Sequence, residues 1–436
     1  MNALLLVLIA AATAAGDPLP PDVKDTDRVR WLADHSLPIR SIDPKDEDFS
    51  DLQPLVSRIG NARVVQLGEA THGDGSTFLA KARLVKFLHE VMGFDVLAWE
   101  AGIFDVRRVD AALRSDMPLA EVGTQGLYGI WSRSAEVQPT LAYVRSTWST
   151  PRPIETVGFD CRISTPENRK ERFPSYVFAF FDRLDPKLIS PQERADLTAM
   201  SVGLVPAEYY EKPGERNYNR ALPKRLVAVI DERRSDLLAH HSAREIDYVR
   251  QILVSLMSMD RALPGQMTNA TADGYTRDTA MAENLLWHLN GPLKDRKVIV
   301  WAHNYHILKD IHARVAKERA AGSGRPYTGP MGKFLDAALG REMVTVAFLS
   351  HHGRYAYVGE PPEDIPAVAP DSLEELLHAT GRPLLLLDLR SAPEGHWLRE
   401  PVTASFYMYE PIPTDWPRLY DLVFFIDEQK PSTKVP

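Results

Sequence analysis

Short, almost continuous runs of apolar residues recur along the chain and are typical of buried β-strands. Two of them, VVQL at 64–67 and DVLAWE at 95–100, flank a segment with a different period. Apolar side chains recur there at every third or fourth residue from Phe78 to Met92, which predicts an amphipathic helix that ends near Gly93. A strand, a helix and a second strand of this kind predict a right-handed βαβ unit with parallel strands.

Apolar runs and helical periods continue to alternate along the chain. Helices are expected at 103–115 and 134–147. Further strands are expected at 154–160, 297–303, 343–349, 383–389 and 422–427, with a short one at 405–409. A strand whose side chains are apolar on both faces packs against other elements on both sides of its sheet. The expected fold class is therefore α/β, with a mostly parallel central sheet flanked by helices. The link after 383–389 contains Pro393 and Pro401, so the last strands could be antiparallel edges.

The pattern also divides the chain into segments. Residues 165–290 are charged, helical in period and interrupted by prolines, which predicts a large helical insertion or cap. This insertion would separate a first half of the α/β core at 63–164 from a second half at 291–430. An approach segment at 17–62 precedes the core. Because 436 residues exceed one simple core, the chain is either one large domain with an insertion or two domains.

The first sixteen residues differ from the rest of the chain. An apolar stretch at 4–12 leads into Ala12-Thr13-Ala14, an A-x-A pattern, although no positive charge other than the α-amino group precedes it. We expect residues 1–16 to be a signal peptide cleaved near Ala14–Gly16, and the protein to be periplasmic or secreted; a retained anchor or a misassigned start is the alternative. No later stretch approaches the ~18 apolar residues of a membrane span, so none is expected in the mature protein.

Composition narrows the function classes. The net charge of −8 is spread without basic runs, so a small-molecule substrate is expected rather than nucleic acid, while the oligomeric state stays open. Cys161 is the only cysteine, which excludes an intrachain disulfide. The G-x-S-x-G elbow is missing, which argues against a serine hydrolase of the α/β-hydrolase type, and no Walker A sequence is present. Gly93 interrupts an H-E-x-x-H pattern that begins at His89, which excludes a zincin of that type.

Titratable side chains stand at or just past the ends of most expected strands. They are Glu69, His72, Glu100, Asp160, Arg162, His303, His306, His351, His352, Asp388 and Arg390. Each alone is an ordinary loop residue, but ligands of parallel sheets bind at the carboxyl ends of the strands. Together they predict a polar cleft, in which a histidine held by a carboxylate activates water and a cation or second histidine stabilises the oxyanion. The roles of the last four residues are left open.

Several motifs, in order over most of residues 50–427, carry a resemblance to a known family. They are LGEATHGDGSTFLAKARLVKFL, WEAG, VGFD, RDTAMAENLLWHL, VWAHNYH and YMYEPIPTDWPRLYDLVFFID. The chain resembles the erythromycin esterase family and, more distantly, a wider group with haem-binding and metalloprotease-like members. The resemblance implies hydrolysis of an ester or a macrolide lactone, with no required metal or cofactor.

The resemblance also implies roles for the site residues. His72 would be the general base, Glu69 its neighbouring carboxylate and Glu100 an orienting acid. His303 would support the oxyanion or the substrate, with His306 beside it.

Four further residues are assigned to substrate binding. Lys81 stands where macrolide-cleaving members tend to have arginine, and it supplies charge without a bidentate fork. Asp160, Arg162 and Arg277 complete the set, although Arg277 could instead form an ion pair at the start of its helix.

Two other functions remain open at this stage. The chain could be a metal-dependent hydrolase or peptidase with His72, Glu100, His303 and His306 as ligands. It could also be a periplasmic binder that holds haem or another small molecule without turnover. The preferred prediction is an exported esterase of the erythromycin esterase type, with antibiotic resistance as one role.

Overall fold

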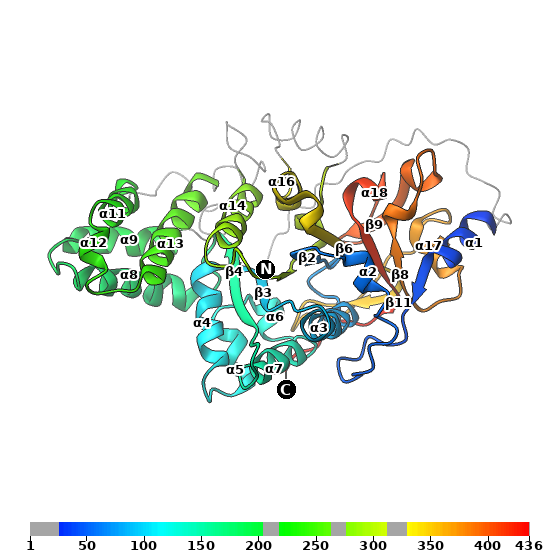
Figure 1. Ribbon diagram of the computed structural model, residues 1–436, viewed down its shortest axis with the longest axis horizontal. Helices are drawn as coiled ribbons and strands as arrows, with labels where there is room; N and C mark the ends of the chain where they lie inside the picture. Colours follow the sequence, from blue (N-terminus) through cyan, green and yellow to red (C-terminus); the bar gives the residue numbers. More distant parts are fainter. Residues whose placement is uncertain (1–25, 204–217, 263–275, 312–328, 436) are drawn as a thin grey trace.

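A nine-stranded sheet runs through the centre of the molecule (Figure 1). This computed structural model describes residues 26–203, 218–262, 276–311 and 329–435, so the expected signal peptide lies outside the described residues. In spatial order the strands are β1 (Ser36–Pro38), β8 (Leu384–Asp388), β11 (Leu422–Gln429), β6 (Met343–Tyr355), β2 (Val64–Leu67), β5 (Val298–Trp301), β3 (Val96–Gly102) and β4 (Glu155–Asp160), and β7 (Glu363–Asp364) pairs with β6.

The strands from β11 to β4 pair in parallel, whereas β8, near one edge, pairs antiparallel with both β11 and β1. The predicted fold class, a mostly parallel sheet flanked by helices, is confirmed. The link between β8 and β11, residues 389–421, contains no helix longer than four residues and so no long crossover helix, which agrees with the antiparallel pairing of the two strands. The short strand expected at 405–409 is β9 (Val402–Tyr407), and it pairs with β10 (Glu410–Thr414) in a separate two-stranded sheet.

Alternate side chains of each central strand enter opposite hydrophobic layers. Val96 and Ala98 of β3 pack in the layer formed by α14 (Arg277–Asn290), α16 (Met331–Leu339) and α17 (Leu373–His378). Leu97 and Trp99 pack in the layer formed by α2 (Leu55–Ile59), α3 (Gly75–Glu90), α4 (Ile103–Leu113) and α7 (Gln138–Thr147). This two-sided burial explains why the strands are apolar without alternation.

Helices form a group at one end of the molecule, beyond β4 (Figure 1). They are α8 (Phe173–Asp182), α9 (Pro191–Gly203), α11 (Ala221–Glu232), α12 (Arg234–Leu237) and α13 (Ala243–Ala262). This group has its own hydrophobic core, to which α14 contributes Ala280. Because α14 also packs Met281 and Leu285 against the sheet, it joins both parts. The segment boundaries expected from the sequence stay a prediction.

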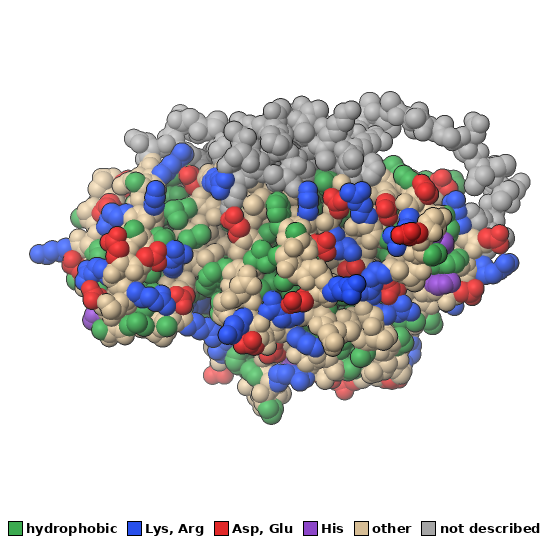
Figure 2. All heavy atoms as spheres, turned by 45° about the horizontal axis from the view of Figure 1, so that its top comes forward, with side chains coloured by type: hydrophobic (Ala, Val, Ile, Leu, Met, Phe, Trp, Pro, Cys, Tyr) green, Lys and Arg blue, Asp and Glu red, His purple; other side chains and the backbone are tan. Residues whose placement is uncertain are grey.

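Four further helices pack against these layers. They are α1 (Thr26–His35), α5 (Leu119–Val122), α6 (Gly129–Ser132) and α18 (Trp416–Leu419). Acidic and basic side chains are interspersed on the face that Figure 2 shows. Within the described ranges, no helix is long and apolar enough to cross a membrane.

One strand differs from its expected length. We expected a strand at 343–349 with His351 and His352 just beyond it, and this is wrong: β6 continues to Tyr355. The extension is held by β11, which pairs Glu428 with His352 and Gln429 with Gly353. The two histidines therefore lie within a strand rather than in a loop after it.

Candidate active site

The loop that follows β2 carries Glu69 and His72 and is held from two sides. A Cβ atom on Gly68 would lie 1.9 Å from the side-chain oxygen of Asn304, so glycine is needed for this approach. Asp74, which is fully buried, accepts hydrogen bonds from the Thr71 backbone nitrogen at 2.9 Å and the Tyr409 hydroxyl at 2.9 Å. Burial raises the pKa of Asp74 to about 6. The loop conformation is thus specified by side chains distant in sequence.

Glu69 is completely buried and bonds to three side chains. Its Oε1 lies 2.7 Å from His72 Nδ1 and accepts from Trp131 Nε1 at 3.1 Å, while Oε2 accepts from Lys81 Nζ at 2.5 Å. A buried carboxylate requires such donors because it has left the solvent. Glu69 therefore links His72 to a buried cation.

Lys81 lies beneath the site rather than at its surface. Its side chain has no exposed area, and Nζ also donates to the Ala302 carbonyl at 3.3 Å and sits 4.4 Å from the centre of the Trp301 ring. Burial lowers the pKa of Lys81, and the charge of Glu69 acts in the opposite direction. Lys81 was expected to bind substrate, but its contacts place it as the partner of Glu69.

The His72 ring is the part of this group that reaches solvent, with 21% of its side chain exposed. Because Nδ1 faces the Glu69 carboxylate, Nδ1 carries the proton and Nε2 keeps its lone pair. The ring is edge-to-face with Trp131 at 5.1 Å, with His303 at 5.2 Å and with Tyr357 at 6.5 Å between ring centres. This is the arrangement that a histidine base requires.

His303 is buried in a single tautomer. Its Nδ1 accepts from the Tyr305 backbone nitrogen at 3.0 Å, so the proton resides on Nε2. Burial first, and then electrostatic interaction with His72 and His306, lowers the pKa of His303 well below its usual value, so the ring is neutral. Among the described residues, its buried Nε2 has no hydrogen-bond partner of normal geometry, although an interaction of the ring with the Ala70 backbone acts against burial on its pKa. Such a donor is available to an oxygen of a ligand.

Glu100 occupies a bulge in β3. Between the pairs Trp99–Gly158 and Gly102–Asp160, β3 carries one residue more than β4. A Cβ atom on Gly158 would lie 2.3 Å from the Gly102 carbonyl oxygen, so the glycine of the VGFD motif makes room for the bulge. The bulge lets Glu100 turn toward the site although it lies within a strand.

Glu100 is surrounded by donors. Its Oε2 accepts from the His303 backbone nitrogen at 3.0 Å, and its Oε1 accepts from Arg277 Nη2 at 2.9 Å and lies 3.2 Å from His306 Nε2. Burial alone would raise the pKa of Glu100, but the charges of His306 and Arg277 hold it well below its usual value. Glu100 therefore positions His303 through its backbone.

Asp160 collects a second group of donors. It accepts from Arg277 Nη2 at 2.7 Å, from Arg162 Nε at 3.0 Å and from the Tyr128 hydroxyl at 2.9 Å. Burial opposes ionisation, yet the two arginines hold the pKa of Asp160 far below its usual value. Arg277 thereby bridges Glu100 and Asp160, which is the ion-pair alternative considered from the sequence.

His306 lies between two carboxylates. Its Nδ1 is 2.7 Å from Asp278 Oδ1, and its Nε2 faces Glu100. Burial alone would lower the pKa of His306, but Asp278 and Glu100 together raise it to about 9. Arg277 Nη1 also lies 3.2 Å from Nε2, but the two carboxylates set the direction of the shift, which favours the protonated ring at neutral pH.

The structure brings together nine of the predicted residues and places the other four elsewhere. The nine are Glu69, His72, Lys81, Glu100, Asp160, Arg162, Arg277, His303 and His306, which form one connected network. Asp388 and Arg390 bond to each other at 2.8 Å, and Asp388 bonds to Arg58 at 3.1 Å, at the edge strand β8. His351 and His352 face α17 and β11.

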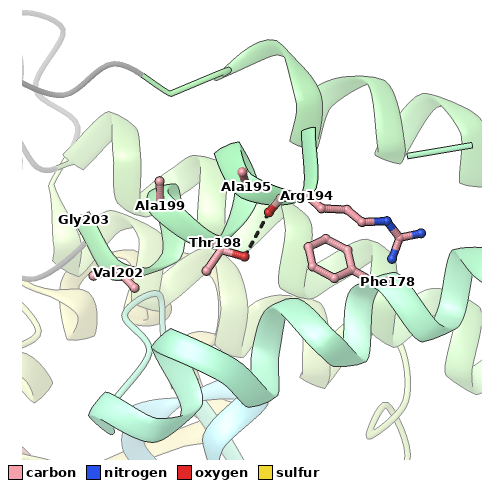
Figure 3. A pocket seen from close by; sticks show the side chains of 7 residues that line it. All are labelled: Phe178, Arg194, Ala195, Thr198, Ala199, Val202 and Gly203. Carbon is pink, nitrogen blue, oxygen red and sulfur yellow. Dashed lines mark hydrogen bonds between the residues drawn. The ribbon is translucent and has the colours of Figure 1, made fainter. Parts of the chain in front are cut away.

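Sequence reasoning missed Asp278, Trp131 and Tyr357. Asp278 had a signal, because it follows Arg277 within the RDTAMAENL motif. Trp131 and Tyr357 had none, because nothing in their local pattern links them to His72. A separate hollow in the helical group is lined by residues of α8 and α9, among them Phe178, Arg194 and Thr198 (Figure 3), and contains none of the network.

A family model described as erythromycin esterase matches residues 89–429. The chain belongs to the erythromycin esterase family. The matched range includes Glu100, Asp160, Arg277, His303 and His306, while the loop with Glu69 and His72 precedes it. The resemblance inferred from the motifs is confirmed.

Two named relatives and one solved structure are similar to this chain. The chain is 25% identical to the putative hydrolase YbfO of Bacillus subtilis (strain 168) over 423 residues, which cover 92% of this chain and 91% of that protein. It is 25% identical to erythromycin esterase type II of Escherichia coli over 342 residues, which cover 75% and 78% of the two chains. A histidine-to-asparagine mutant of the erythromycin esterase EreC, in its open conformation, shares the fold with a TM-score of 0.69 and 18% identity, covering 90% of this chain and 97% of that one.

Proposed function

We propose that this protein, a hydrolase of the erythromycin esterase family, cleaves an ester or a lactone with water activated by His72. One observation carries the proposal: a partly exposed imidazole bonded to a buried carboxylate stands edge-to-face with a second imidazole whose N–H is unpartnered. The first ring can accept a proton and the second can donate a hydrogen bond. Those are the two tasks of ester hydrolysis without a protein nucleophile.

The proposed reaction uses each group in a defined way. His72 Nε2 removes a proton from water as the water oxygen attacks the carbonyl carbon, and the π electrons move to the carbonyl oxygen. His303 Nε2–H donates to that oxyanion. When the tetrahedral intermediate collapses, the C–O bond to the alcohol breaks and His72 returns its proton to the departing oxygen. Glu69 stabilises the transient imidazolium, and Lys81 balances the charge of Glu69.

The contacts of three of the four candidate metal ligands favour this scheme over a metal-dependent one. Glu100 uses both oxygens for protein donors. His306 has a carboxylate oxygen beside each ring nitrogen, at 2.7 Å from Nδ1 and 3.2 Å from Nε2. His303 Nδ1 is occupied by a backbone N–H. We therefore propose a hydrolysis that uses no metal and no cofactor.

A macrolide lactone is the first substrate to test, because one relative is named erythromycin esterase type II. The buried Lys81 presents no cation at the surface of the site, so other esters and lactones belong in the same panel. The apolar segment 1–16 supports the further proposal that the protein acts in the periplasm or outside the cell.

The test is a panel of esters, lactones and macrolides, each followed by mass spectrometry for the addition of one water. We expect at least one substrate to be hydrolysed by the wild type and turnover to fall by about 10²–10⁴-fold in His72→Ala, with the circular dichroism spectrum unchanged. His240→Ala, at an exposed histidine in the helical group, is the matched control and should keep full activity. Full activity of His72→Ala would refute the proposal.

A further inference from the structure

Three histidines and an aspartate gather away from the network around His72. His351 and His352 come from β6, His378 from the end of α17 and Asp427 from β11. Each residue can offer one ligand atom, and these four atoms lie within 4.8 Å of one another. Neutral imidazole and carboxylate are ligands that suit zinc.

The spacing of these atoms resembles that of a tetrahedral site. His351 Nδ1 and His352 Nδ1 are 3.2 Å apart, His378 Nδ1 and Asp427 Oδ1 are 2.6 Å apart, and His352 Nδ1 and Asp427 Oδ1 are 3.9 Å apart. Zinc–ligand bonds of about 2.0–2.1 Å place neighbouring ligand atoms about 3.3 Å apart at the corners of a tetrahedron. Each of these three separations lies within about 0.7 Å of that value.

A second carboxylate orients one of the imidazoles. His351 Nε2 lies 2.8 Å from Glu375 Oε2, so Nε2 carries the proton and the Nδ1 lone pair faces the cluster. Histidines that bind metals almost always donate their other ring N–H in this way. The His351 ring is also stacked on that of His378, with centres 4.0 Å apart and an angle of 6° between the planes.

The position of the cluster allows an ion to enter. The side chains of His352 and His378 are 50% and 43% exposed, whereas those of His351 and Asp427 are 17% and 21% exposed. His351 and Asp427 are therefore held by the surrounding protein, while His352 and His378 lie on the solvent side of the cluster. Because the parallel pairing of β6 and β11 holds His351, His352 and Asp427, most of the site is built before any ion binds.

We propose that these four residues bind one zinc ion, with Glu375 as the positioning residue of His351. The ion ties together β6, β11 and the end of α17. This site is structural and is independent of the hydrolysis proposed for His72, because it shares no residue with that network. The sequence left His351 and His352 without a role, and zinc binding would assign the same role to both.

The test starts from the full chain, stripped with a chelator and dialysed. Titration with zinc chloride in a calorimeter should show one saturable equivalent that persists in His72→Ala, which separates this site from the catalytic histidines. His352→Ala combined with His378→Ala should abolish it, while His240→Ala should not change it. Cobalt(II) should give the visible absorption of a tetrahedral complex in the wild type and not in the double variant.

Two further measurements keep the test decisive. Glu375→Gln should weaken zinc binding about 10–100-fold, because it removes the carboxylate that orients His351. Free zinc at about 100 times the dissociation constant should raise the thermal midpoint by about 3 °C in a chain of this size. Absence of saturable binding in the wild type, or its survival in the double variant, would overturn the proposal and leave only a hydrogen-bonded cluster.

Discussion

The buried cation His306 should make the stability of the protein depend on pH in a predictable window. Its pKa is raised from the usual 6.5 to about 9 by Asp278 and Glu100, against the effect of burial. A shift of about 2.5 units corresponds to roughly 3 kcal/mol. Its side chain is 12% exposed, so solvent screens this contribution only weakly.

The sign of this pH dependence follows from the number of protons that the folded and unfolded states bind. Below about pH 6.5 the folded and unfolded chains both hold the His306 proton, and the stabilisation is fully present. Between about pH 6.5 and 9 only the folded chain holds it, so the free energy of unfolding falls as the pH rises. Above about pH 9 the contribution is lost. The lowered pKa values of Glu100 and His303 keep the charge states of both constant across this window.

The assay compares wild type and His306→Gln by urea unfolding at a series of pH values. The free energy of unfolding should be higher in the wild type than in the variant. This difference should be about 3 kcal/mol larger at about pH 6 than at about pH 10. Asp278→Asn, which leaves His306 one carboxylate, should move the decline to lower pH. His240→Gln is the control for an exposed histidine. A stability difference between wild type and His306→Gln that does not vary with pH would refute the reasoning.

Three further predictions concern the same site. His303→Phe should lower kcat on a hydrolysed substrate by about 10²–10³-fold with a smaller change in KM, because it removes the only proposed oxyanion donor. A change in KM with kcat unaltered would contradict that role. Lys81→Met should cost about 3–5 kcal/mol in urea unfolding by leaving Glu69 buried without its cation, and Lys81→Arg should cost less. Gly158→Ala should lower the thermal midpoint and the activity together, because its Cβ would lie 2.3 Å from a backbone carbonyl of β3, whereas Gly129→Ala, whose Cβ has room, should change neither.

The sequence was sufficient to predict the features that depend on neighbouring residues. The period of the apolar positions between Phe78 and Met92 predicted α3, and the apolar runs predicted the central strands. The spacing of three residues between Glu69 and His72 lets the two side chains meet, and they do so at 2.7 Å. Because parallel strands place their carboxyl ends on one edge, residues from four separate strand ends could be assigned to one site.

Features that depend on distant pairing could not be predicted in this way. The bulge that turns Glu100 toward His303 arises from the register of β3 on β4. The extension of β6 past 349 depends on its pairing with β11. The direction of Lys81 is set by Glu69 and by the Trp301 ring, which local periodicity does not place beside it. Each of these is a contact between segments far apart in the chain.

The unpartnered N–H of His303 has a consequence for inhibitor design. A ligand oxygen placed at Nε2 need not break an existing hydrogen bond, so it gains the interaction in a desolvated setting. A boronic acid that adds water, with transfer of a water proton to His72 Nε2, becomes a tetrahedral anion with an oxygen at that place, whatever alcohol the natural substrate releases. Mimics of this kind bind far more tightly than substrates do. Small boronates could therefore occupy and report on this site before its physiological ester is known.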